Sequence, residues 1–366
     1  GMVAVRDIAR GTLLLSERAL VVVKDESETS GDDRQHSDME TRARAVSELM
    51  RRMEDDEAVA RVVYDFYAGD VAPPAALDGA GNEGGRLPVD RAFVEAAFKF
   101  NSFGPFCIPR VADPVAGGLG GDQSGKVGMW AMAAKYNHSC VPNTVRNYVG
   151  VNLMFFATTD IKKGEEITVE YTPVERPLSR RTEVFAQFGF VCDCKLCEHQ
   201  RNAPKERIEL RDRLLKDFEE QQFPLLLEEN PMPIEPVLEF MDKLNATYEA
   251  DSPYHLEKVG LFDLLGMLYE ERNMYREATE SYIAAYQAAG GRNPRLCMMV
   301  FRALVCSAKQ DRTADSRTQT RHLLDELVEL YALRAGGDLD TALKMVAQDM
   351  ALSEQGAALV DEGFLK

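Results

Sequence analysis

The sequence predicts an α+β protein whose short strands come before a helical C-terminal half. In residues 1–24, and again between residues 143 and 170, apolar residues alternate and glycines mark turns, which is typical of strands. From about Pro204 onward, apolar residues recur at helical spacing and prolines separate one helix from the next. Three cysteines between Cys192 and Cys197 lie where the two regions meet.

Length, composition and charge limit the class of protein. With 366 residues and 45% hydrophobic content, the chain can form two or three domains with cores of their own. No apolar run approaches the roughly 18 residues of a membrane span, and no basic segment precedes the apolar run at residues 13–23, so we expect neither a membrane segment nor a signal peptide. The formal net charge of −17 argues against nucleic acid as a partner and suits a basic partner, although acidity also serves solubility alone.

Turn and helix signals predict the elements in chain order. Strands are expected at residues 2–6, 12–15, 19–23, 143–149, 152–158 and 166–170, with bends at Gly11, Gly150 and Gly164. Helices are expected within residues 39–67, over 89–100, and from Ser179 as N-cap to Phe188, with Gly189 just beyond. Glycine-rich loops are expected at residues 73–88, where the chain should be mobile, and at 112–128.

The spacing Cys192-x-Cys194-x2-Cys197 places three thiols in one tight loop, which predicts a metal site. Seven cysteines, an odd number, in a chain with no expected export signal favour reduced thiols, and with them a cytoplasmic or nuclear location. Closed zinc sites have four ligands, and the candidates for the fourth are Cys140 and His199. Cys140 is favoured because a distant ligand ties two chain segments together. Such a zinc ion is structural, since four thiolates leave no position for water.

Two further motifs precede these cysteines: Asn137-His138-Ser139-Cys140, and Gly164-Glu165-Glu166-Ile167-Thr168-Val169-Glu170-Tyr171. In this order, the three motifs resemble the catalytic half of a SET-domain lysine methyltransferase with its post-SET zinc motif, of the SMYD-like (SET and MYND) kind. The resemblance implies a β-rich SET core, S-adenosyl-L-methionine as methyl donor, and a basic protein or peptide as substrate. It also implies structural zinc on Cys140, Cys192, Cys194 and Cys197.

The resemblance assigns roles to single residues. Tyr171 matches the catalytic tyrosine, and strand alternation puts Val169 on the same side, where a small residue hints at room for more than one methyl group. The implied cofactor-binding residues are Gly1, Met2, Asn101, Asn137, His138, Tyr171 and Phe190. The implied walls of the substrate lysine channel are Phe103, Val169 and Phe188. Ordinary core packing explains the aromatic residues nearly as well.

The resemblance covers residues 1–24 and 92–200 and departs from the family in two places. The family's Gly-x-Gly cofactor loop is represented only by Gly1-Met2-Val3-Ala4, which is similar to its second half. Residues 25–106 contain no cysteine, so an acidic helical insertion stands where SMYD-like proteins carry a MYND zinc finger. We therefore expect an N-terminal SET part (1–24), the insertion (25–91), the SET core (92–188), a post-SET zinc motif (189–200) and an all-α TPR-like domain (201–366).

Within the helical region, one segment resembles a single tetratricopeptide (TPR) helix pair, in which small residues allow two helices to approach closely. Its residues are Leu265, Gly266, Tyr269, Ala278, Tyr282 and Ala285. A peptide-binding groove and plain core packing account for this pattern about equally well.

Two functions are consistent with these observations. The first is an S-adenosylmethionine-dependent protein-lysine N-methyltransferase, monomeric, acting on a basic histone or non-histone protein, without direct nucleic-acid or membrane contact. The second is a catalytically weak SET-fold scaffold that works through its helical domain. The incomplete Gly-x-Gly loop favours the scaffold, whereas Asn137, His138 and Tyr171 favour the enzyme.

Overall fold

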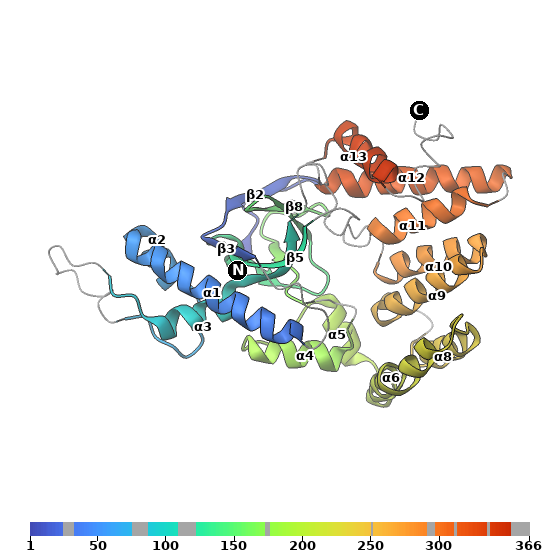
Figure 1. Ribbon diagram of the computed structural model, residues 1–366, viewed down its shortest axis with the longest axis horizontal. Helices are drawn as coiled ribbons and strands as arrows, with labels where there is room; N and C mark the ends of the chain where they lie inside the picture. The colour runs from blue at the N-terminus through green and yellow to red at the C-terminus, as the bar shows by residue number, and fades with distance from the viewer. Residues whose placement is uncertain are drawn as a thin grey trace. The chain divides into compact units, whose positions relative to one another are not determined.

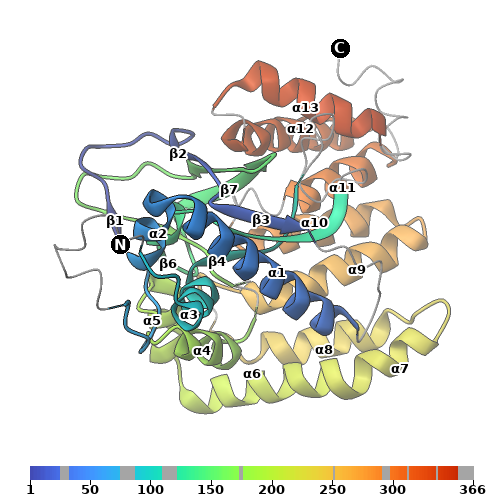
Figure 2. The same ribbon diagram turned by 60° about the vertical axis from the view of Figure 1, so that its left-hand side comes forward.

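The computed structural model describes residues 1–24, 33–74, 87–108, 122–172, 176–249, 252–290, 297–310, 313–334 and 337–352. The chain forms two compact units: Gly1–Ala4, Leu13–Asn137 and Arg146–Phe156 make the first, and Val5–Thr12, His138–Val145 and Ala157–Lys366 make the second. Small three-stranded sheets and many helices give the expected α+β class (Figures 1 and 2). Among the described helices, none has the length and apolar character needed to cross a membrane.

The elements have the following bounds. The strands are β1 (Met2–Val3), β2 (Leu13–Arg18), β3 (Val21–Lys24), β4 (Ser102–Ile108), β5 (Asp122–Met129), β6 (Asn137–His138), β7 (Thr144–Val149), β8 (Asn152–Ala157) and β9 (Glu166–Val169). The helices are α1 (Asp33–Asp55), α2 (Glu57–Tyr64), α3 (Arg91–Asn101), α4 (Leu178–Gln187), α5 (Lys195–Asn202), α6 (Lys205–Asp217), α7 (Phe223–Glu228), α8 (Glu235–Asn245), α9 (Val259–Glu271), α10 (Tyr275–Ala288), α11 (Cys297–Ala308), α12 (Ala314–Arg334) and α13 (Leu339–Leu352).

The first unit contains two antiparallel sheets, in the strand orders β2-β8-β7 and β3-β5-β4. Strand β2 pairs with β8 from Leu13 opposite Phe156 to Arg18 opposite Asn152. Helix α1 packs against β3 and β5 and also contacts α2 and α3 (Figure 2). Their apolar faces form one buried core, as expected from the helical spacing of apolar residues in this insertion.

Strand β5 occupies residues that the glycine content assigned to a loop, so the prediction of a loop up to Gly128 was wrong. Gly128 pairs with Val22 on one side and Phe103 on the other. A Cβ atom at Gly128 would lie 2.7 Å from the Trp130 ring and 2.8 Å from the Val21 carbonyl oxygen. Glycine is present here because a ring and a backbone approach closely, and not because the chain turns.

In the second unit, the segment from Val5 to Thr12 runs beside later parts of the chain. Ile8 forms an isolated antiparallel bridge with Ile161, and the Gly11 amide donates to the Ala157 carbonyl at 2.8 Å. Strand β9 lies next to β6, and Asn143 secures β9 by accepting from the Thr168 amide and donating to the Glu166 carbonyl, both at 2.9 Å. These contacts bring the end of β9 close to the residues that follow β6.

The C-terminal part of this unit is a succession of helices, and consecutive helices from α9 to α13 pack side by side (Figure 1, orange to red). The TPR-like signal corresponds to the pair α9 and α10. Gly266 faces the fully buried ring of Tyr282, and a Cβ at Gly266 would lie 2.4 Å from that ring. The small residue therefore permits the close helix approach that the sequence predicted.

The remaining bounds of helices and strands agree in part with those predicted from the sequence. The hairpin around Gly150 is confirmed, and the helical spacing within residues 39–67 belongs to α1, which begins earlier at Asp33, and to α2. Ser179 was wrongly predicted as an N-cap: Pro177 holds that position, and Ser179 lies in the first turn of α4. Gly189 follows α4 with a φ of 75°, as expected for a glycine past a helix end. The loop predicted at residues 73–88 lies mostly outside the described residues.

Candidate metal centre and aromatic site

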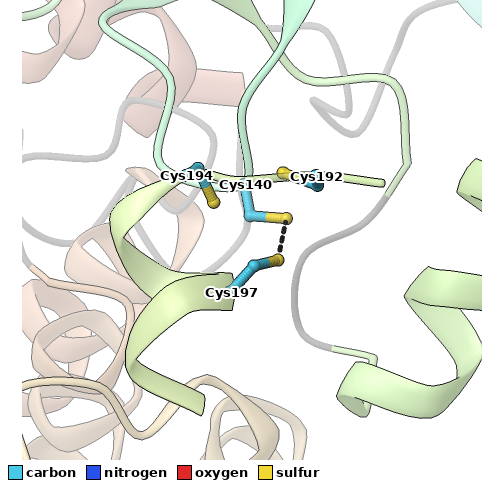
Figure 3. A group of neighbouring side chains, drawn as sticks. All are labelled: Cys140, Cys192, Cys194 and Cys197. Carbon is cyan, nitrogen blue, oxygen red and sulfur yellow. Dashed lines mark hydrogen bonds between the residues drawn. The ribbon is translucent and has the colours of Figure 1, made fainter. Parts of the chain in front are cut away.

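Four cysteines gather in the second unit (Figure 3). Their Sγ atoms all lie within 4.8 Å of one another, and the Cys140 and Cys197 sulfurs are 3.5 Å apart. Cys140 comes from the segment after β6, Cys192 and Cys194 precede α5, and Cys197 lies in its first turn. Three of the four side chains are buried and Cys194 is half-buried.

Local backbone contacts hold these cysteines in place. Cys194 is the N-cap of α5, and its carbonyl accepts from the Glu198 amide at 2.9 Å. Arg201, near the other end of α5, donates to the Cys192 carbonyl at 2.7 Å. Leu196 and Phe185 pack against the sulfurs as fully buried side chains. The loop and the start of α5 are thus ordered around the sulfur atoms.

The donor set fits a soft metal ion, because closely spaced thiolates in tetrahedral sites are typical zinc ligands. Hydrogen bonds from Cys140, and then from Cys194 and Cys197, lower the pKa of the Cys192 thiol. Cys140 shares its proton with these neighbours, so hydrogen bonding to Cys192 first, and burial after it, raise the pKa of Cys140. A bound metal would take the place of these shared protons.

His199, the other candidate for the fourth ligand, is not in this group. Its Nε2 lies 3.2 Å from the Ser252 Oγ, and its ring contacts the Tyr254 ring edge-on at 5.7 Å. Among the described residues, the structure therefore gathers Cys140, and not His199, with the three clustered cysteines.

The ring of His138 connects the cysteines to Tyr171. Its Nδ1 accepts a hydrogen bond from the Tyr171 amide at 3.0 Å, and its Nε2 lies 3.2 Å from the Cys140 sulfur. Because Nδ1 is an acceptor, the neutral ring carries its proton on Nε2 and donates it to the sulfur. His138 is buried and packs against Phe185 at 4.5 Å between ring centroids.

Tyr171 lies within a group of aromatic rings. Its centroid is 5.5 Å from Phe188, 6.2 Å from Phe190 and 5.3 Å from His138. Burial, and secondarily the charge of Glu166, raise the pKa of Tyr171 to about 12. The phenol therefore remains protonated at neutral pH, in apolar surroundings.

Other residues predicted for the site are placed as follows. Val169 is the last residue of β9, is buried, and its carbonyl accepts from the Ser139 amide at 2.9 Å. Tyr171 lies two residues past the strand end, so strand alternation does not fix its side relative to Val169.

Asn101, Phe103, Gly1, Met2 and Asn137 belong to the first unit. The amide of buried Asn101 donates to the carbonyls of Tyr67 and Ala97, so any contact with a cofactor falls to its side-chain oxygen. Phe103 packs edge-on against Trp130 at 5.7 Å. Asn137 and Gly1 are exposed, and Met2 is half-buried in β1.

Several residues that contribute to this site were not predicted from the sequence. The ring of His138 was given no role, Asn143 was not expected to secure β9, and Phe185 was not included among the aromatic residues. One signal for Phe185 was available: it precedes Phe188 and Phe190 within a six-residue window that ends just before Cys192.

Comparison with known proteins identifies a SET region in the chain. Residues 1–172 match the SET domain model. A SET domain-containing protein of Acanthamoeba polyphaga mimivirus is 39% identical over 69 residues, 18% of this chain and 26% of that protein. N-lysine methyltransferase SMYD2-B of Danio rerio is 40% identical over 65 residues, 18% of this chain and 15% of that protein. Histone-lysine N-methyltransferase SMYD3 of Homo sapiens is 36% identical over 75 residues, 20% of this chain and 18% of that protein.

The matched segments span at most 26% of these relatives, so the likeness concerns the SET region and not the whole of either chain. The SET match contains His138, Cys140 and Tyr171, together with Asn137, and ends before Cys192, Cys194 and Cys197. Residues 1–172 therefore match a SET domain, and within this region the chain is similar to the SET and MYND methyltransferases.

Proposed function

We propose that this protein transfers methyl groups from S-adenosylmethionine to lysine side chains of a basic protein. Zinc on Cys140, Cys192, Cys194 and Cys197 would stabilise the region around the reacting groups. One observation carries the proposal beyond the SET match: the protonated phenol of Tyr171 is held among aromatic rings, and its backbone is tied through His138 to the cysteine cluster.

The reaction is an in-line displacement in which a neutral lysine amine attacks the methyl carbon and the methyl–sulfur bond breaks. S-adenosylmethionine, when bound, supplies the methyl group as an electrophile. The half-buried rings of Phe188 and Phe190 would limit the access of water to the reacting groups, and apolar surroundings favour the neutral form of an amine. Because the pKa of Tyr171 is about 12, the phenol stays protonated and neutral at neutral pH. Its hydroxyl can therefore orient the amine or the methyl group without acting as a base.

Zinc would act structurally in this scheme. Four thiolates would complete its coordination and leave no position at which water or substrate could be activated. The cysteines come from both sides of the Tyr171 segment, at Cys140 before it and Cys192 to Cys197 after it. A metal bound there would hold these two segments together, and His138 would convey that order to the Tyr171 amide.

The substrate and the remaining cofactor contacts follow from charge and resemblance. A formal net charge of −17 favours a lysine in a basic segment over one in an acidic segment. We assign donor binding to Gly1, Met2, Asn101, Asn137, His138 and Phe190, and the lysine channel to Phe103, Val169 and Phe188. Reduced zinc-binding thiols suit the cytoplasm or nucleus.

The decisive experiment is methyl transfer from labelled S-adenosylmethionine to pools of basic proteins. Tyr171→Phe should reduce incorporation by about 100-fold or more, because one oriented hydroxyl is removed from the reacting centre. Tyr275→Phe is the matched control: it removes the same atom from α10, where the hydroxyl donates to the side-chain oxygen of nearby Asn273 at 2.6 Å.

Both variants should bind S-adenosylhomocysteine in calorimetric titrations as the unmodified protein does. Incorporation that persists in Tyr171→Phe would contradict the role of the phenol. A protein that neither transfers methyl groups nor binds S-adenosylhomocysteine would instead be a SET-fold scaffold.

A further inference from the structure

We propose that Arg181 is the internal counter-charge of the four-cysteine centre, a positioning residue whose guanidinium stabilises the thiolate ligands once zinc is bound. The inference rests on the zinc site of the proposed function and is independent of methyl transfer. It concerns a side chain that is neither a metal ligand nor a member of the aromatic group around Tyr171.

Arg181 lies on α4 and is completely buried, with 0% of its surface exposed. One helical turn later, Phe185 packs against the clustered cysteines. The Nη2 of Arg181 donates to the side-chain oxygen of Gln200, which lies on α5 one turn after Cys197. The guanidinium is thus held between the helix that packs on the cysteines and the helix that begins with them.

The observed contacts of Arg181 do not neutralise its positive charge. Gln200 is neutral, and Nε and Nη1 of Arg181 are buried without a hydrogen-bond partner among the residues that the structure describes. The carboxylate of Glu257 is one residue further along the network, where it accepts from Gln200 at 2.7 Å and from the Tyr248 hydroxyl at 2.8 Å. A buried cation with two orphan donors is costly unless an anion is nearby.

The four cysteines supply that anion when they bind a metal. Four thiolates around one Zn²⁺ leave a net charge of about −2, which is also unfavourable in a buried site without compensation. Arg181 lies one helical turn before Phe185, which packs with Cys140 and Cys197 in one buried cluster, and it bonds to Gln200 one turn after Cys197. The two N–H groups of Arg181 that have no partner among the described residues carry positive charge, and the thiolates carry excess negative charge. Such pairing is usual between metal ligands and the groups that surround them.

The neighbouring arginine shows what an ordinary surface residue does on the same helix. Arg180 is exposed and forms an ion pair with Glu183 at 3.3 Å, one turn along α4. Helix packing alone would be served by an apolar side chain at position 181, without a buried charge. The contrast between adjacent arginines points to the cysteine centre as the reason for the buried one.

The test is a zinc titration of the full chain against a chromogenic chelator, with zinc content measured by mass spectrometry. Arg181→Met, which removes the charge and keeps an apolar side chain, should weaken zinc binding about 10- to 100-fold. Arg181→Lys keeps a positive charge and should remain within about threefold of the unmodified protein. Arg180→Met is the matched control and should bind zinc normally.

Three outcomes decide the question. Weak binding by Arg181→Met with near-normal binding by Arg181→Lys supports the counter-charge. Equal affinities for the unmodified protein and Arg181→Met, or equal losses in Arg181→Met and Arg181→Lys, overturn it. If Arg181→Met does not fold, Arg181→Gln replaces it as the neutral variant to compare with Arg181→Lys. The glutamine removes the positive charge and keeps a hydrogen-bond donor for Gln200. Absence of zinc binding in the unmodified protein would refute the proposed metal site itself, so the two failures can be told apart.

Discussion

Two groups of buried cysteines in the second unit differ in how the fold brings them together. Cys140 and the three cysteines around the start of α5 come from separated segments and converge to within 4.8 Å (Figure 3). Cys297 and Cys306 are equally buried, but they lie more than two turns apart on the single helix α11. Burial is common to both groups, whereas convergence from separated segments distinguishes the candidate metal ligands.

The electrostatic surroundings also distinguish the two groups of cysteines. Burial, with a further contribution from the charge of Glu270, raises the pKa of Cys306 to about 12, so its thiol is kept neutral. In the cluster, hydrogen bonds from neighbouring thiols lower the pKa of Cys192. The thiolate form is therefore favoured at Cys192, where neighbouring thiols donate hydrogen bonds, and disfavoured at Cys306.

The largest expected effect comes from removing one member of the cluster. Cys140→Ser should weaken zinc binding by about 3 kcal/mol, or roughly 100-fold, since four ligands share a binding free energy of about 10–16 kcal/mol. The loss should also lower the midpoint of thermal unfolding. Cys306→Ala should leave zinc content unchanged and reduce the free energy of unfolding by only about 1 kcal/mol. Equal zinc content in the two variants would remove the distinction between the groups.

A smaller effect is expected from separating the two contacts of His138. His138→Gln can keep a donor toward Cys140 and loses the acceptor for the Tyr171 amide, so methyl transfer should fall about tenfold while zinc is retained. His138→Asn can keep an acceptor near the amide and loses the donor, so zinc release to a chelator should be faster while transfer is largely kept. The reverse pattern would mean that the ring does not connect the two sites as its contacts indicate.

The smallest effect is a difference in chemical reactivity. Because the pKa of Cys306 is raised to about 12, its thiolate fraction at pH 8 should be about 1000-fold below that of an ordinary cysteine. Alkylation at this position, followed by mass spectrometry of the native protein, should rise about tenfold per pH unit from pH 8 to pH 10. A rate that levels off near pH 9 would show an unperturbed thiol.

Much of the fold follows from local sequence signals. The hairpin at Gly150, the amphipathic helices of the insertion and the α9–α10 pair each depend on periodicity and turn residues that lie close together in the chain. Strand β5 was missed because Gly128 serves close packing against Trp130, which local sequence does not reveal. The N-cap of α4 was misassigned because a serine suggests a cap but Pro177 precedes the helix.

At the site, too, residues close together in the sequence were predicted, whereas contacts between distant segments were not. Spacing alone pointed to Cys192, Cys194 and Cys197, and motif resemblance added Cys140 and Tyr171. The contact of the His138 ring with both Cys140 and Tyr171 depends on how β6 and β9 pair. The burial of Arg181 depends on how α4 meets α5. Neither has a counterpart in the linear pattern of residues.

The course of residues 5–12 has a practical consequence for expressing parts of this protein. This segment folds with the C-terminal helices: Arg10 forms an ion pair with Glu329 of α12 at 3.3 Å, and Gly11 lies close to the Gly337 backbone. A fragment that stops after the fifth helix would leave this early stretch without that support. Residues 5–12 and helix α12 should therefore be kept together when a minimal folded form is sought.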